Sequence, residues 1–127
     1  MSKDVATLDQ EETIKKAVDL INSRQIGSVI VTQSGKPVGI FSEHDVMRLI
    51  RQFAFRTAME GETNLAALKL REVMSKPLIT TNPNATITDA YDLMIQKNVR
   101  HLPVVDGGKL IGMLAERDVF RAKRILV

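Results

Sequence analysis

A serine and an aspartate stand three residues apart, as Ser42 and Asp45, where an apolar run ending at Phe41 meets the start of a predicted helix. A helix start carries backbone N–H groups without intrahelical partners and the positive end of the helix dipole, so it holds phosphate well. A carboxylate beside it can accept hydrogen bonds from both hydroxyls of a ribose. The same pair also fits a capping box, worth about 1 kcal/mol of helix stability. The segment therefore predicts either a sugar-phosphate site or a stable helix start.

A second segment of the same pattern, residues 112–118, helps to weigh these two interpretations. Asp118 matches Asp45, but Ala115 stands where the first segment has Ser42, and alanine has no side-chain oxygen to cap a helix. An aspartate retained without the hydroxyl is half a capping box, which modestly favours the ribose interpretation. Common descent of the two segments would explain the same retention.

The residues that open each predicted hairpin differ between the two halves of the chain. Gly27 and Ser28 leave room for a flat group to approach the backbone, whereas Arg100 and His101 offer cationic or donor groups suited to phosphate. Taken singly, a surface arginine and a hydrogen-bonded structural histidine are the better interpretations of the second pair.

These segments belong to an internal repeat. When the chain is shifted by 73 positions, residues 1–51 align with residues 74–124 without a gap, and eighteen of the 51 pairs are identical. Average composition gives about three matches in such a window. Two copies of one unit imply a pseudo-two-fold module in which any cleft between the copies occurs twice.

Each copy predicts the order strand, helix, strand, strand, helix, which is an α+β fold. Threonines at the N-cap position, apolar residues at helical spacing and glycine-containing turns mark these elements. In the first copy they fall at 5–8, 14–21, 28–32, 38–41 and from about 43; in the second they fall at 78–81, 87–94, 102–105, 110–114 and from about 116.

The domain boundaries follow from the repeat, with the first copy at 1–51, a connector at 52–73 and the second copy at 74–127. We expect helical segments that pack, rather than a flexible linker, because the connector has an apolar character. Its apolar residues are Phe53, Phe55, Met59, Leu65, Leu68 and Leu70.

Composition narrows the functional classes. The chain has 127 residues, 44% hydrophobic and 26% charged, with no cysteine and no apolar stretch approaching a membrane span, so we expect a single cytoplasmic module without disulfides. The net charge of +3 is accompanied by no helix-turn-helix and no aromatic stacking platform, which argues against nucleic acid.

An enzyme is also disfavoured. Ser42, His44 and Asp45 include the residue types of a nucleophilic triad, but neighbours at one helix start cannot form the nucleophile–base–orienter line that the mechanism requires. With two histidines and no cysteine, the chain has little material for metal or covalent catalysis, so we expect no metal and no catalytic cofactor.

The chain resembles the tandem CBS domain family, named after cystathionine β-synthase. It shares the repeat order, the Gly-x-x-Ser/Thr-x-x-Asp signature at Gly39–Asp45 and the His-Leu-Pro-Val-Val run at His101–Val105. The resemblance covers essentially the whole chain. Ala115 departs from the signature, and the turn that would precede the first strand is missing because the sequence starts at Met1.

The resemblance implies a pair of clefts that bind an adenosine nucleotide, AMP, ADP or ATP, with S-adenosylmethionine ranked behind them. Asp45 and Asp118 would hold ribose hydroxyls. Phosphate would face Ser42 and His44 in one cleft and Arg100, His101 and Arg117 in the other. The adenine slots would involve Val5, Thr7, Gly27, Ser28, Leu78, Ile79, Thr80, Arg100 and His101. Pro103 is a further expected ligand-binding residue.

The implied function is a nucleotide sensor that acts on an unknown regulated protein. The family also pairs such modules into a disc of four repeats, so a homodimer is expected. Apolar residues near the relevant helices that would supply the contact are Leu49, Ile50, Phe53, Phe120, Ile125 and Leu126. Two alternatives stay open: a ligand-free dimerisation or interaction scaffold, and the regulatory domain of a larger enzyme or transporter.

Overall fold

The computed structural model describes residues 5–60 and 64–120, which form two compact units. One unit consists of residues 6–78. The other contains the described residues from 79 onward, together with residue 5. The first unit therefore extends past Met74, where the second sequence repeat begins.

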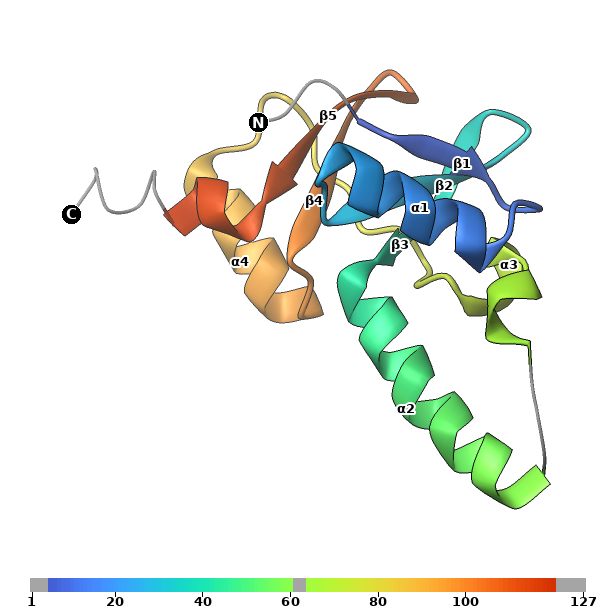
Figure 1. Ribbon diagram of the computed structural model, residues 1–127. Helices are drawn as coiled ribbons and strands as arrows, with labels where there is room; N and C mark the ends of the chain where they lie inside the picture. The colour runs from blue at the N-terminus through green and yellow to red at the C-terminus, as the bar shows by residue number, and fades with distance from the viewer. Residues whose placement is uncertain (1–4, 61–63, 121–127) are drawn as a thin grey trace. The chain divides into compact units, whose positions relative to one another are not determined.

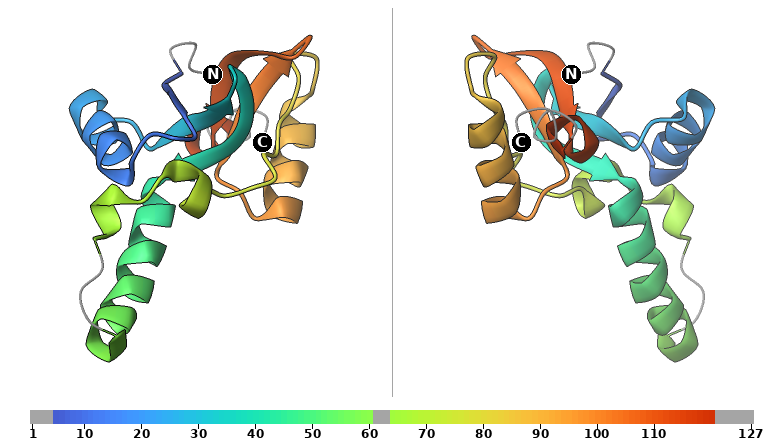
Figure 2. Two further views of the ribbon diagram at one scale, coloured as in Figure 1. Left: turned by 90° about the vertical axis from the view of Figure 1, so that its right-hand side faces the viewer. Right: turned by 90° about the vertical axis from the view of Figure 1, so that its left-hand side faces the viewer.

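The first unit contains the strand–helix–strand–strand–helix order that the sequence predicts (Figure 1). Its elements are β1 (Thr7–Asp9), α1 (Ile14–Arg24), β2 (Ser28–Gln33), β3 (Lys36–Ser42), α2 (Glu43–Glu60), η1 (Leu65–Ala67) and α3 (Leu70–Val73). The sheet order is β1-β2-β3, with β1 parallel and β3 antiparallel to β2. In the two views of Figure 2, α2 leaves the end of β3 as one continuous helix.

The core of the first unit forms between the sheet and the inner faces of α1 and α2. Four consecutive residues of β2 are buried, which is the pattern of a central strand covered on both faces. The buried residues of this apolar cluster are Ala6, Ile14, Ala17, Ile21, Val29, Val31, Phe41, Leu49, Leu70 and Val73.

The connector packs against the first unit, as predicted. Residues 68–71 run beside the start of α1, where Ile14 N donates to Leu68 O and Leu70 N donates to Glu12 O. Leu65, Leu68 and Phe53 pack against the first core and Leu70 is part of it. The side chains of Phe55 and Met59 lie outside the described residues.

The second unit contains α4 (Ile87–Lys97), β4 (His101–Asp106) and β5 (Lys109–Ala115), and residues 116–120 begin the second helix. Among its described residues, Ala90, Met94, Leu102 and Val119 form a buried apolar cluster. The two hairpins have the same register: Ser28 pairs with Ser42, and His101 pairs with Ala115, 73 positions later. Each hairpin also shifts register after an equivalent residue, Val31 or Val104.

The helix caps predicted from the sequence are confirmed. The side-chain oxygens of Thr13 and Thr86 accept hydrogen bonds from N–H groups in the first turn, and Asp89 completes a capping box with Thr86. Both helices end on a left-handed residue, Gln25 and Asn98, each with φ of 53°.

The strand predicted at residues 78–81 does not form as a strand. Thr81 makes an isolated parallel bridge to Val104, with Thr81 N donating to Pro103 O and Val105 N donating to Thr81 O. The first unit has two further bonds at this place, from Ile30 N to Ala6 O and from Gln10 N to Thr32 O. Their donors correspond to Pro103 and Pro83, which have no N–H, so only the two middle bonds remain.

Candidate functional site

Asp45 lies in the first turn of α2 and is 3% exposed. Its Oδ2 accepts hydrogen bonds from the backbone N of Ser42 at 2.9 Å and from Ser42 Oγ at 3.3 Å. This is the carboxylate half of the predicted capping box, in which the third helical residue returns to the residue before the helix.

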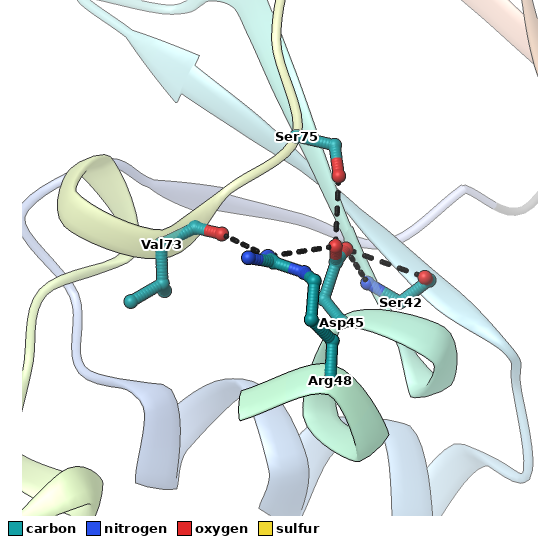
Figure 3. A network of polar contacts seen from close by, with 5 residues as sticks. All are labelled: Ser42, Asp45, Arg48, Val73 and Ser75. Carbon is teal, nitrogen blue, oxygen red and sulfur yellow. Dashed lines mark hydrogen bonds and ion pairs between the residues drawn. The ribbon is translucent and has the colours of Figure 1, made fainter. Parts of the chain in front are cut away.

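The other carboxylate oxygen of Asp45 contacts two residues that the sequence analysis did not select (Figure 3). Ser75 Oγ donates to Oδ1 at 2.7 Å, and Arg48 donates from a guanidinium nitrogen at 3.2 Å. Arg48 also donates to Val73 O at 3.1 Å. Arg48 is matched by an arginine at position 121, and Ser75 by a serine at position 2. That identity between the repeats was the signal that could have identified both residues.

Ser75 is positioned by the attachment of the chain directly after the connector to β3. Ser75 N donates to Ile40 O at 2.9 Å, and Ile40 N donates to Ser75 O at 3.1 Å. Glycine at position 39 suits this attachment. A Cβ there would lie 2.7 Å from Met74 Sδ, closer than real Cβ contacts, and 3.0 Å from the backbone oxygen of Ser75, at the tight limit of such contacts. Gly39 of the signature therefore lets Met74 and Ser75 lie close against the strand.

The residue before β2 is bonded to the start of α2. Glu43 N donates to Gly27 O at 3.1 Å, and Ser28 lies opposite Ser42 in the hairpin. The expectation that this helix start leaves its N–H groups unpaired is therefore wrong for Ser42 and Glu43. The Asp45 carboxylate and the Gly27 carbonyl already accept them.

The second unit repeats this arrangement with different side chains. Ala115 N donates to Asp118 Oδ2 at 2.9 Å, and Glu116 N donates to Arg100 O at 2.8 Å. The half capping box therefore forms without a hydroxyl, so the retention of Asp118 does not by itself favour a ribose site. His101 lies opposite Ala115, which places Arg100, His101 and Asp118 at one end of the hairpin.

The remaining predicted site residues are placed as follows. His44, Arg117 and Arg100 are exposed, and Pro103 is buried within β4. Thr7 is an exposed residue at the start of β1. Val5, Leu78 and Ile79 are half-buried, and Thr80 is exposed. The structure therefore brings Gly27, Ser28, Ser42 and Asp45 together in the first unit, with Arg48 and Ser75 added to them.

The residues expected to support a homodimer divide into separate groups. Leu49 is 3% exposed and belongs to the first unit's own core, so its prediction as an intermolecular contact is wrong. Phe53 packs partly against the same core. Ile50 and Phe120 are 50% and 45% exposed, and Phe120 makes an edge contact with Tyr91. Residues 125 and 126 lie outside the described part of the chain.

Two further properties concern only the described residues. Within residues 5–60 and 64–120, no helix has both the length and the apolar character that crossing a membrane requires. The same residues contain no group of three histidine, aspartate or glutamate side chains arranged to hold a metal ion.

The sequence matches one protein family twice. The family model of the CBS domain matches residues 1–52 and again residues 70–124. The chain belongs to the CBS domain family. It carries two CBS domains, and the α+β fold read from the sequence is confirmed.

Individual CBS proteins resemble the chain over nearly its full length. It is 33% identical over 119 residues to the CBS domain-containing protein YhcV of Bacillus subtilis (strain 168), covering 94% of the chain and 79% of that relative. The crystal structure of the CBS-domain containing protein ATU1752 from Agrobacterium tumefaciens matches with a TM-score of 0.80 and 27% identity. That match covers 95% of this chain and 90% of the other.

Two related folds were solved with bound ligands. The structure of CBSX2 in complex with AMP matches with a TM-score of 0.75 and 22% identity, covering 99% of this chain and 93% of that one. The CBS domain pair of protein MJ0100, in complex with 5′-methylthioadenosine and S-adenosyl-L-methionine, matches with a TM-score of 0.77 and 21% identity. It covers 100% of this chain and 94% of that one.

Proposed function

We propose that this CBS pair is a regulatory module that binds an adenosine nucleotide, with the ribose at Asp45 in the first repeat and at Asp118 in the second. The observation that carries the proposal is the Asp45 carboxylate. It is buried, fixed from both sides, and accepts a hydroxyl hydrogen bond on each of its two oxygens. Two acceptors fixed in this way are what the two hydroxyls of a ribose require.

The surroundings of each carboxylate support a phosphate nearby. In the first repeat Ser42 and the exposed His44 flank the helix start. In the second repeat Arg100, His101 and Arg117 supply a more cationic set, which favours phosphate by charge. AMP, ADP and ATP are therefore the proposed ligands, ahead of S-adenosylmethionine. The ligands named for the CBSX2 and MJ0100 complexes all contain adenosine.

The module acts by binding rather than by chemistry. A ligand shifts the equilibrium between two conformations of the module only if it binds one of them more tightly than the other. The regulated protein then responds to the conformation that the ligand favours. We propose that the chain works as a homodimer. Met47 and Ile50, which are 59% and 50% exposed on α2, are apolar side chains that such a contact would cover.

One observation favours a second candidate, a scaffold that binds no nucleotide. The Asp45 carboxylate is already satisfied by protein donors, as a purely structural capping residue would be. A scaffold of this kind would keep the dimer contact and would not respond to adenosine compounds.

Thermal unfolding separates the two candidates. AMP, ADP, ATP and S-adenosylmethionine are each added at millimolar concentration, with GMP and ribose 5-phosphate as controls. A ligand at about 100 times its Kd stabilises the folded state by about 2.7 kcal/mol, which raises Tm by several degrees. We expect that rise with an adenosine nucleotide and not with ribose 5-phosphate. No shift with any adenosine compound would favour the scaffold, and light scattering on the same samples reports the dimer.

A further inference from the structure

The carboxylate of Asp45 has no free acceptor position for a ligand. An ionised carboxylate offers about four lone-pair sites. Four donors reach them: Ser42 N and Ser42 Oγ on Oδ2, and Arg48 and Ser75 Oγ on Oδ1 (Figure 3). A ribose therefore cannot simply add to this carboxylate. It must take the place of donors that are already there.

The four donors differ in how readily they leave. The N–H of Ser42 is part of the backbone at the junction of β3 and α2. Arg48 is held a second time by Val73 O. The two hydroxyls have no such restraint, since each is a single rotor. Ser75 is also exposed, so its hydroxyl can exchange the bond to Asp45 for one to water, at the cost of about one net hydrogen bond.

The two exchangeable hydroxyls are distributed as a vicinal diol would be. Ser42 Oγ occupies one carboxylate oxygen and Ser75 Oγ the other, while Ser42 N and Arg48 each keep one oxygen fixed during an exchange. Of the two, Ser75 makes the shorter bond, 2.7 Å against 3.3 Å. The protein therefore fills the position of the diol with two of its own hydroxyls, and the Ser75 hydroxyl is held more tightly than that of Ser42.

We propose that the Ser75 hydroxyl is an internal competitor of the ribose diol and sets the nucleotide affinity of the first repeat. This inference rests on the proposed function, because it requires that a ribose binds Asp45. When ligand binds, Ser75 gives up Oδ1 and so loses its side-chain bond to α2, while the bond from Arg48 to Val73 O stays in place. The backbone bonds between Ser75 and Ile40 stay in place. Ser75 is thus a positioning residue whose removal strengthens binding.

The test uses the full chain carrying Asp118→Ala, so that binding reports on the first repeat. Calorimetric titration with AMP, 2′-deoxy-AMP and 3′-deoxy-AMP is compared between this background, Ser75→Ala and Ser75→Thr. Ser75→Thr keeps the hydroxyl and is the matched control. Because Ser75 is exposed, both variants are expected to fold, and circular dichroism of each sample verifies this.

We expect Ser75→Ala to tighten AMP binding by about three- to tenfold, the worth of one hydrogen bond exchanged for water. Ser75→Thr should bind like the background. One deoxy compound lacks the hydroxyl that displaces Ser75, and for it Ser75→Ala should bring no gain. Unchanged or weaker AMP binding in Ser75→Ala overturns the inference, and so does an equal gain for all three compounds. If no variant binds any compound, the proposed function of this site fails as well, which is a distinct result.

Discussion

The two repeats have the same backbone arrangement at the hairpin and the following helix start, but they carry different side chains there. Both hairpins have the same register and the same register shift, and both helix starts are tied to the hairpin by one N–H bond. At the carboxylate, however, Asp45 accepts from Ser42 Oγ, Arg48 and Ser75, whereas Ala115 offers Asp118 no hydroxyl. Residues 2 and 121, the counterparts of Ser75 and Arg48, lie outside the described residues.

This difference separates what the aspartate does for the fold from what it offers a ligand. The bond from the backbone N–H to the carboxylate has the same length, 2.9 Å, in both repeats, with a serine in one and an alanine in the other. The structural task therefore needs only the aspartate. The hydroxyls around Asp45 are additional to that task, and they are the groups that resemble a bound diol.

Removal of each aspartate should give the largest difference between the repeats. We expect Asp45→Ala to lower the free energy of unfolding by about 2–3 kcal/mol, since it removes the acceptor of four hydrogen bonds, and Asp118→Ala to lower it by about 1 kcal/mol. Each change should weaken nucleotide binding at its own site only. Urea unfolding measures the first effect and calorimetric titration the second.

The control for this pair is Asp92→Ala, which removes an exposed carboxylate from α4. It should change stability by no more than about 0.5 kcal/mol. Equal costs for Asp45→Ala and Asp118→Ala would contradict the difference argued here. If either change alone removed all binding, the two sites would not be independent.

A smaller effect is expected when the hydroxyl is exchanged between repeats. Ser42→Ala should cost under about 1 kcal/mol, because the carboxylate still accepts the backbone N–H and the lost hydroxyl bond is long. Ala115→Ser should be neutral or slightly stabilising. For AMP, we expect Ser42→Ala to weaken the first site, because the loss of a proposed phosphate donor outweighs the release of Asp45 Oδ2 from a long bond of 3.3 Å. Ala115→Ser should strengthen the second site. No change of affinity in either variant would show that this position does not face the ligand.

Local signals in the sequence were enough to predict most of the fold. The repeat gave the element order, and threonine caps and glycine turns located the helices and hairpins. The second repeat lacks the first strand because Pro83 and Pro103 have no N–H to donate across the pair of segments. Neither segment alone shows this, because it depends on how residues 79–83 pair with β4.

The candidate site was only half predictable for the same reason. Ser42 and Asp45 are three residues apart and were visible as a motif, and Gly27 was found because it opens the hairpin. Ser75 lies 30 positions from Asp45, and only the bridge to Ile40 brings them together. Leu49 was misplaced because an apolar residue on a helix does not state which face it occupies.

The smallest difference between the repeats is at the turn before the first helix. Glu11 N donates to Asp9 Oδ2 at 2.9 Å, and in the second repeat Asn84 N donates to Asn82 Oδ1 at the same distance. The turns are alike, but Glu11 also pairs with the connector, at 2.8 Å from Lys69 Nζ and 3.1 Å from Arg71 Nε. Asn84 carries no charge with which to form such pairs.

The hydrogen bond from Lys69, with the nearby charge of Arg71, lowers the pKa of the Glu11 carboxyl below 4.5. A lowered folded-state pKa stabilises the protein above the unfolded pKa, and this contribution is lost as pH falls through the folded pKa. Glu11→Gln should therefore lower Tm on the order of one degree at pH 7, and this difference should shrink as the pH falls, while Asn84→Gln shows no pH-dependent difference. Because Glu11 is exposed, about 1 M salt should shrink the pH 7 difference. A difference that persisted at low pH would mean that Glu11 stabilises the connector through packing and not through its charge.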